Sequence, residues 1–220
     1  MKAPLVLFAA SAMLAGLLVS LVLRYAVRAA VLDHPSDRSS HSVPTPRGGG
    51  LGLISAFLLV FSVWAPVWDV DWQVVVGLGG VALTALVGWK DDHGGLNVAT
   101  RLAAHVIAGA LLVPLALSPT PVPNWLGAGA AIWWVFWTVS AINVVNFMDG
   151  IDGLIGLQAL VFGLHISILG TDSGLARAFG VALAGAALGF LVWNWAPAKI
   201  FLGDVGSRSE EHTSELQSPI

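Results

Sequence analysis

The sequence predicts an all-α, polytopic membrane protein built as a bundle of transmembrane helices. Of its 220 residues, 56% are hydrophobic and only 10% are charged, and the mean hydropathy is +0.81. A water-soluble domain could neither bury nor solvate such a surface. The apolar residues form seven runs close to the ~20 residues that cross a bilayer, without the alternation of barrel strands. The seven predicted helices cover residues of about 3–23, 51–68, 72–89, 102–117, 125–145, 154–170 and 178–195.

The first run is predicted to be a retained helix rather than a cleaved signal peptide. It is long, it is followed by Arg24 and Arg28, and it shows no small-residue cleavage site. The chain has no cysteine, which excludes disulfides and thiolate metal sites. Its formal charge of -3 is too small to imply a nucleic-acid partner. The lipid bilayer is therefore the partner that composition predicts.

The loops after the first, third, fifth and seventh helices are predicted to share one side of the membrane. Most basic residues fall there, so the positive-inside rule makes that side cytoplasmic. Most aspartates fall there too, and the rule does not explain them. The basic residues of that side are Arg24, Arg28, Arg38, Arg47, Lys90, Arg101 and Lys199, and its aspartates are Asp33, Asp37, Asp91, Asp92, Asp149, Asp152 and Asp204.

The first of these loops, residues 33–50, ends in three glycines at the start of the second helix. Consecutive glycine amides at a helix start can approach and bind an anion. Arg47 is the phosphate-binding candidate of this loop. A flexible polar connector explains the same composition, and the loop is neither a Walker loop nor a dinucleotide fingerprint.

The second loop begins with KDDHGG, residues 90–95, where the third helix ends. The dipole at a helix C-terminus disfavours carboxylates by on the order of 0.3 to 1 kcal/mol. A bound cation would reverse that penalty at Asp91 and Asp92. Two solvated acids in a turn are the alternative, and successive helical residues point ~100° apart, so both need not serve one ligand.

The third loop, NVVNFMDGIDGL at residues 143–154, places Asn143, Asn146, Asp149 and Asp152 at steps of three between two apolar runs. Asp152 is also an acceptable N-cap for the sixth helix, but capping does not account for the other three. The sequence therefore predicts that this stretch takes part in polar chemistry at the membrane surface.

The fourth loop, KIFLGDVGS at residues 199–207, sets Asp204 between two glycines. Carboxylate and amide ligands without cysteine favour a hard cation, and Mg²⁺ typically bridges protein carboxylates to substrate phosphates. Taken together, the four loops predict magnesium-dependent phosphoryl chemistry.

These motifs together resemble one family, the polyprenyl-phosphate N-acetylhexosamine-1-phosphate transferases of the glycosyltransferase family 4 type, from residue 33 to residue 207. SSHSVPTPRGGG looks like the family's first cytoplasmic loop, DDHGGL its aspartate pair, NVVNFMDGIDGL its Asn/Asp signature and FLGDVGS its metal-binding turn. The form TPRGGG is more similar to the branch that starts O-antigen and related envelope glycans than to the muramoyl-pentapeptide branch. Trp89 and Lys90 depart from the family's usual aromatic and aliphatic pattern.

The resemblance implies transfer of an N-acetylhexosamine 1-phosphate from its UDP-sugar to undecaprenyl phosphate, with release of UMP. It implies a multi-pass protein of the bacterial inner membrane with a cytoplasmic active site. About seven helices of a larger family fold would be present, and a homodimer is allowed. Mg²⁺ is the implied cofactor, with Mn²⁺ as an alternative. The implied roles are metal binding by Asp204, handling and deprotonation of the lipid phosphate by Asp91 and Asp92, nucleotide binding by Asn146, Asp149 and Asp152, and contacts to uracil by Asn194 and Phe201.

The last thirteen residues, 208–220, differ in composition from the transferase-like body, residues 1–207. They hold all three glutamates of the chain, and the string resembles the translation of a sequencing-adapter oligonucleotide. We therefore interpret them as non-native and leave them out of the fold prediction, with a solvated polar terminus as the alternative. The family's histidine-rich loop and further helices are expected after Ser207, so the 220-residue chain is expected to be a fragment with little or no activity.

Two other functions fit a polar membrane protein. An ion-coupled transporter places its acidic residues near the bilayer midplane, facing a cavity, whereas here they gather at one predicted interface. A non-catalytic scaffold gives no reason for four polar loops to converge. A phosphosugar transferase is the function that the sequence favours.

Overall fold

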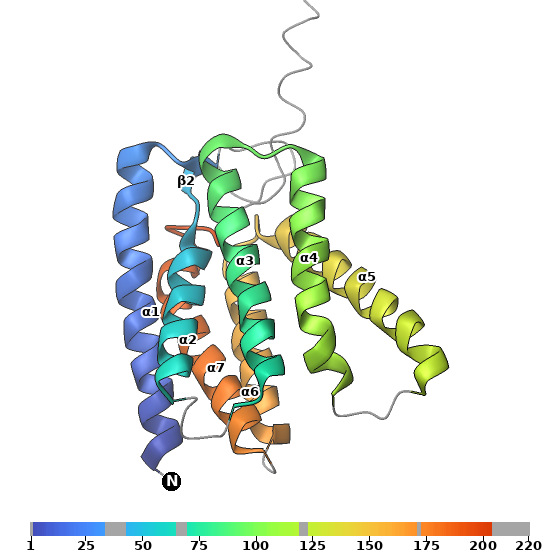
Figure 1. Ribbon diagram of the computed structural model, residues 1–220. Helices are drawn as coiled ribbons and strands as arrows, with labels where there is room; N and C mark the ends of the chain where they lie inside the picture. Colours follow the sequence, from blue (N-terminus) through green and yellow to red (C-terminus); the bar gives the residue numbers. More distant parts are fainter. Residues whose placement is uncertain (1, 34–42, 65–69, 119–122, 171–172, 204–220) are drawn as a thin grey trace, which may run out of the picture.

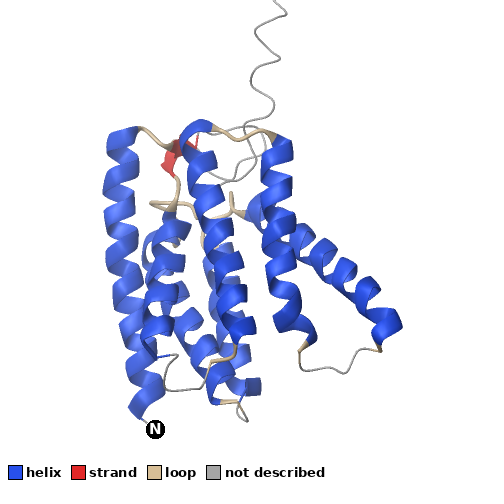
Figure 2. Ribbon diagram, viewed as in Figure 1, coloured by secondary structure: helices blue, strands red, loops and turns tan. Residues whose placement is uncertain are grey.

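Seven helices and one short pair of strands make up the part of the chain that the structure describes (Figures 1 and 2). The computed structural model describes residues 2–33, 43–64, 70–118, 123–170 and 173–203. The elements are α1 (Lys2–Ala29), β1 (Leu32–Asp33), β2 (Thr45–Pro46), α2 (Gly49–Trp64), α3 (Trp72–Gly94), α4 (Val98–Leu117), α5 (Asn124–Met148), α6 (Leu154–Leu169) and α7 (Gly174–Asn194).

The helices confirm the predicted all-α membrane bundle, with two extensions at one end. α1 has 28 residues and continues beyond the apolar run to include Arg24 and Arg28. At 1.5 Å per residue it is about 42 Å long, so its last turns reach past a hydrocarbon core of ~30 Å. α3 continues through Asp91 and Asp92 to Gly94, so both aspartates lie in its last turns.

Five helices are long and apolar enough to cross a membrane, namely α1, α3, α4, α5 and α7. α2 and α6 are apolar but have 16 residues each, which corresponds to about 24 Å of helix. These two shorter helices end below the charged end of α1 and α3, which leaves room there for loops to fold inward (Figure 1).

α7 forms the centre of the bundle and packs against α1, α2 and α6. Small residues make this packing close: a Cβ added at Gly189 would lie 2.2 Å from the carbonyl oxygen of Ala12 on α1. Membrane helices commonly associate through such small residues, because the backbones can then approach. The rigid centre therefore holds the end of α7, from which the segment after Asn194 emerges.

α3, α4 and α5 pack in sequence beside this centre, and α5 slants away from it (Figure 1). Only the C-terminal end of α5 returns toward α6, where the two helices are joined by residues 149–153. The ends of α1, α3, α5 and α7 lie at the same end of the bundle, as alternation of crossings predicts (Figure 1).

β1 and β2 form a two-residue antiparallel pair at that end, and the sequence analysis does not predict it. Leu32 lies opposite Pro46, and Asp33 lies opposite Thr45. Arg47 extends the pairing by donating its amide hydrogen to the carbonyl oxygen of Val31 at 3.2 Å. The pair brings both ends of the first loop together above α2.

Candidate active site

Residues 198–203, which lie directly after α7, are the point where the four predicted loops meet. The segment first bonds to the loop that carries TPRGGG: the amide of Phe201 donates to the carbonyl oxygen of Pro46 at 2.9 Å. The amides of Gly49 and Gly50 donate in return to the carbonyl oxygens of Phe201 and Leu202, at 2.9 and 2.7 Å. We call residues 198–203 the convergence segment.

The glycines at the start of α2 therefore serve backbone packing. A Cβ on Gly50 would lie 2.8 Å from the carbonyl oxygen of Leu202, so only glycine permits this approach. The amides of Gly49 and Gly50, which the sequence analysis assigns to an anion, donate to the convergence segment instead. These two amides could bind an anion only if their hydrogen bonds to the convergence segment were broken.

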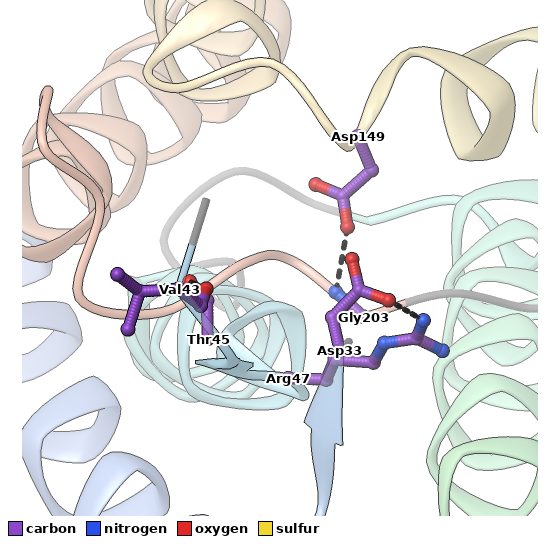
Figure 3. Close-up of polar contacts among 6 residues, drawn as sticks. All are labelled: Asp33, Val43, Thr45, Arg47, Asp149 and Gly203. Carbon is purple, nitrogen blue, oxygen red and sulfur yellow. Dashed lines mark hydrogen bonds and ion pairs between the residues drawn. The ribbon is translucent and has the colours of Figure 1, made fainter. Parts of the chain in front are cut away.

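The Asn/Asp loop reaches the convergence segment through two carboxylates. Asp149, only 5% exposed, accepts the amide hydrogen of Leu202 at 3.1 Å. It also accepts the amide hydrogen of Gly203 at 2.9 Å (Figure 3). Asp152 accepts the amide hydrogen of Ala198 at 3.1 Å. These charge-assisted bonds fix the path of the segment.

Asp152 does not cap α6, so the capping alternative is wrong. The N-cap position is Gly153, which has a left-handed φ of 73° and no side-chain capping bond. Glycine adopts that conformation without steric cost, and the Asp152 side chain is left to bond Ala198 across the loop. The polar side chain thus joins two loops rather than ending one helix.

The two adjacent aspartates of α3 point to different partners, as the angular spacing of helical residues predicts. Asp91 is buried; it accepts the amide hydrogen of Leu96 and forms an ion pair with Arg101 of α4, whose Nη1 lies 3.2 Å from Asp91 Oδ2. Asp92 faces the convergence segment: a Cβ on Gly203 would lie 2.5 Å from Asp92 Oδ2. Asp92, rather than Asp91, is therefore the aspartate of the pair that lies against this segment.

Arg47 forms an ion pair with Asp33 across the β1–β2 pair (Figure 3). Both side chains are largely buried, with 12% and 19% of their surfaces exposed. The Arg47 guanidinium is thus held by the first loop itself. Its predicted role with phosphate stays a prediction.

Asn194 and Phe201 are both buried in the structure. The Asn194 side chain, 1% exposed, donates through Nδ2 to the carbonyl oxygen of Ile200 at 3.0 Å and so closes the turn after α7. Phe201 is anchored through its backbone, since its amide donates to Pro46. A uracil ring could stack on Phe201 only after neighbouring side chains move.

Two buried oxygen atoms beside the convergence segment lack a hydrogen-bond partner among the described residues. They are Oδ1 of Asp152 and Oδ1 of Asn194. Leaving a buried acceptor unsatisfied costs about 1–3 kcal/mol. A ligand with N–H or O–H groups would satisfy both, and their predicted contact with a nucleotide stays a prediction.

Asn146 lies half-buried in the last turn of α5, where its carbonyl oxygen accepts the amide hydrogen of Asp149 at 3.3 Å. Asp204 lies outside the described residues, immediately after Gly203. Among the described residues no group of three His, Cys, Asp or Glu side chains could hold a metal. Mg²⁺ needs only one or two protein carboxylates besides substrate phosphates, and Asp92 beside residue 203 fits that smaller demand.

Arg101 and Asp33 also belong to the site, although no sequence motif indicates them. Each pairs with a residue that the motifs do single out: Arg101 with Asp91, and Asp33 with Arg47. A lone basic residue ten positions after an aspartate pair is the available signal for Arg101. The sequence analysis counts that residue only toward membrane orientation.

Comparison with known proteins matches the same stretches of chain. The model of a protein family described as glycosyl transferase family 4 matches residues 74–210, more than half of the chain. The chain belongs to glycosyl transferase family 4. The match includes the aspartate pair, the Asn/Asp loop and the convergence segment. With five helices long enough to span a membrane, this family member is a multi-pass membrane protein.

Two individual relatives carry names of different phosphosugar transferases. The chain is 32% identical over 211 residues to a decaprenyl-phosphate N-acetylglucosaminephosphotransferase of Mycolicibacterium smegmatis, covering 83% of this chain and 51% of the relative. It is 33% identical over 214 residues to a phospho-N-acetylmuramoyl-pentapeptide-transferase of Synechococcus sp. strain JA-3-3Ab, covering 90% of this chain and 62% of the relative. The chain thus spans between half and two thirds of the length of these relatives.

Proposed function

We propose that this family 4 protein transfers an N-acetylhexosamine 1-phosphate from a UDP-sugar to a polyprenyl phosphate such as undecaprenyl phosphate, with release of UMP. The observation that carries the proposal is that the first and third polar loops bond to residues 198–203 at one end of a membrane bundle, with Asp92 of the second loop beside Gly203. The names of the relatives, which are phosphosugar transferases, support it.

The reaction joins a water-soluble donor to a membrane-bound acceptor. An oxygen of the lipid phosphate attacks the phosphorus attached to the sugar, and the bond from that phosphorus to the bridging oxygen breaks. The bridging oxygen and its electron pair leave with UMP, so a diphosphate link to the lipid is formed and no oxidant is needed. A site where the bundle meets water serves both partners, because neither must leave its own phase.

Asp92 is the residue of the pair that we assign to the lipid phosphate. Both carboxylate oxygens of Asp91 already accept hydrogen bonds, from Leu96 and Arg101. Asp92 instead lies against Gly203, where it can orient the attacking phosphate and accept its remaining proton. Phosphoryl transfer depends mainly on such alignment and on charge neutralisation.

Mg²⁺ fits this arrangement as the cofactor, with Mn²⁺ as an alternative. Asp92 and Asp204 would hold it, since Asp204 is the residue directly after Gly203 in the sequence and carboxylate oxygens are the ligands that Mg²⁺ prefers. When bound, the ion neutralises charge on the diphosphate of the donor. Both oxygens of Asp149 accept backbone amide hydrogens of residues 202 and 203, so we assign this side chain to positioning the segment.

We place the active site on the cytoplasmic face of a bacterial inner membrane, because the basic loops share that end of the bundle. The start of an envelope glycan such as O-antigen is the pathway that TPRGGG favours. Relatives named for N-acetylglucosamine and for muramoyl-pentapeptide match at similar identity, so the donor needs a direct test. Asp91 and Asp92 lie in the last turns of α3, and Asp149 and Asp152 lie directly after α5, which argues against a midplane transport site.

The test is an assay of the product of the complete gene, with the 220-residue chain beside it, in nanodiscs that contain undecaprenyl phosphate. UDP-N-acetylglucosamine, UDP-N-acetylgalactosamine and UDP-N-acetylmuramoyl-pentapeptide, each labelled in the sugar, serve as donors. Transfer of label to lipid with an equal yield of UMP supports the proposal. Release of UDP in place of UMP would overturn it, because the sugar would then have moved without its phosphate.

A further inference from the structure

A cavity of about 340 Å³ lies between α1, the start of α2 and the end of α3. That volume is at the lower end of the range for small-molecule sites. Its wall is largely apolar and includes Leu21, Val22, Ala26, Val31 and Leu51. It lies at the charged end of the bundle, so it is an apolar space next to the polar loops.

A cluster of aromatic side chains closes the cavity between α1 and α3. The His93 ring stacks on Tyr25 of α1, with centroids 5.5 Å apart, and packs on Trp89 at 4.6 Å. His93 Nδ1 lies 2.7 Å from the carbonyl oxygen of Trp89, and Nε2 lies 2.9 Å from Tyr25 Oη. Because a carbonyl only accepts, Nδ1 carries the hydrogen, and in the neutral ring Nε2 accepts from Tyr25. The polar atoms of the cluster satisfy one another.

The cavity is bordered on one side by residues of the bundle's outer surface. Leu21, Tyr25 and Trp89 all line it and are 49%, 47% and 41% exposed. On a membrane helix such exposed apolar side chains face lipid, and aromatic residues near a helix end favour the interface. A hydrocarbon chain could therefore enter the cavity from the bilayer.

The other border of the cavity is Gly48, which also contacts the convergence segment. A Cβ on Gly48 would lie 3.7 Å from Val22 Cγ1 and 3.9 Å from Asp92 Oδ2. A Cβ on Gly203 would lie 3.1 Å from the Cα of Gly48. The apolar wall and the proposed phosphate site thus meet within one residue.

We propose that this cavity binds the isoprenyl units nearest the phosphate of the polyprenyl phosphate acceptor, an assignment that rests on the proposed function. In a polyprenyl phosphate the hydrocarbon begins one oxygen atom from the phosphorus, whereas a phospholipid places a glycerol ester between them. The position of Gly48 between Val22 and the Asp92 side of the site matches the first arrangement. The cavity would then select the lipid by the group attached to its phosphate.

The first test is photolabelling of the 220-residue chain in nanodiscs with a farnesyl phosphate that carries a diazirine on its first isoprenyl unit. Label is expected on peptides that contain residues 21–26 of α1 and residues 89–93 of α3, and excess undecaprenyl phosphate should remove it. Label elsewhere in the bundle would overturn the assignment. Equal removal by phosphatidylglycerol would also overturn it, because the cavity would then be a general acyl-chain site.

The second test is a matched pair of substitutions on α1. Leu21→Trp narrows the border of the cavity at a half-exposed position, and Leu17→Trp, one helical turn earlier and 56% exposed, is the control. Leu21→Trp is expected to lower, by roughly tenfold, the labelling that excess undecaprenyl phosphate removes. Losing one or two buried methylene contacts produces a factor of that size. In the complete gene product it should raise KM for undecaprenyl phosphate and leave KM for the UDP-sugar unchanged.

The two proposals fail in different ways. If the complete gene product transfers the sugar phosphate but the cavity wall shows no label that undecaprenyl phosphate removes, the cavity assignment is rejected and the transferase proposal stands. Competed labelling of the wall without transfer from any UDP-sugar keeps the lipid site and rejects the transferase. Equal effects of Leu21→Trp and Leu17→Trp would also reject the cavity assignment.

Discussion

Asp149 accepts the amide hydrogen of Gly203 at 2.9 Å, although 54 positions of sequence separate the two residues. The second oxygen of the same carboxylate accepts from Leu202. Asp149 is buried at the end of α5, so the slanted helix ends on the segment that leads to Asp204. The position of α5 and the position of Leu202 and Gly203 are therefore linked through one side chain.

Replacement of Asp149 by alanine is expected to destabilise the protein and to reduce transfer. It leaves two backbone N–H groups without their acceptor, at a total cost on the order of 3 kcal/mol. For a protein of this size that corresponds to a fall of roughly 5–10 °C in the melting temperature. Thermal unfolding in detergent micelles measures the change. Asp71→Ala is the control, since Asp71 precedes α3 at the opposite end and makes no side-chain capping bond.

Replacement of Gly203 by alanine tests the backbone of the convergence segment. Gly203 has a φ of 114°, which side-chain-bearing residues rarely adopt, and the new Cβ would meet Asp92 Oδ2. The expected cost is about 1–3 kcal/mol, together with a large loss of transfer. Gly127→Ala is the control, because a Cβ at that position in α5 meets nothing within 4 Å. Similar melting temperatures and activities for the two variants would contradict the close contact with Asp92.

The sequence predicts the helices well because each one is specified locally, by a run of apolar residues long enough to span lipid. It also predicts which loops share an end, because each helix that crosses the membrane places the next loop on the opposite side. The sequence predicts a central place for the Asn/Asp stretch at residues 143–154, yet the first and third loops bond to residues 198–203, and Asp92 of the second loop lies against the same segment. Backbone bonds such as Phe201 to Pro46 leave no sequence pattern, since any residue can make them.

The side-chain partners are harder to predict for a similar reason. Asp91 and Asp92 are identical and adjacent, and only the three-dimensional fold gives one to Arg101 and the other to Gly203. Asp152 looks like a helix cap in the sequence, but Gly153, in a left-handed conformation, occupies the cap position. The Asp152 carboxylate bonds to the amide of Ala198 instead. Local propensity indicates the residue types, and tertiary contacts determine their roles.

Arg101 is expected to act as a positioning residue that holds the end of α3. Arg101→Ala leaves the buried Asp91 carboxylate without its ionic partner, and breaking such a pair costs about 3 kcal/mol. Melting temperature and transfer should both fall, while Arg101→Lys should recover part of each. Arg177→Ala, at an exposed position in the first turn of α7, should change neither.

A double-mutant cycle separates the ion pair from other effects of these substitutions. If Arg101 acts through Asp91, the loss in the Arg101→Ala and Asp91→Ala double variant is smaller than the sum of the two single losses. Additive losses in the free energy of unfolding would show that the two residues stabilise the fold independently.

Asp92 is expected to matter for the metal and the phosphate. Asp92→Asn keeps the size of the side chain but removes the charge beside Gly203. Because Mg²⁺ prefers carboxylate oxygens, the Mg²⁺ concentration for half-maximal transfer should rise by roughly tenfold or more. EDTA should abolish transfer by the unsubstituted protein, and added Mg²⁺ should restore it. The matched control is Asp71→Asn, at the other end of α3, which should keep the original Mg²⁺ dependence. An Asp92→Asn protein with unchanged Mg²⁺ dependence but a much lower melting temperature would mean that Asp92 supports the convergence segment and leaves the metal to other residues.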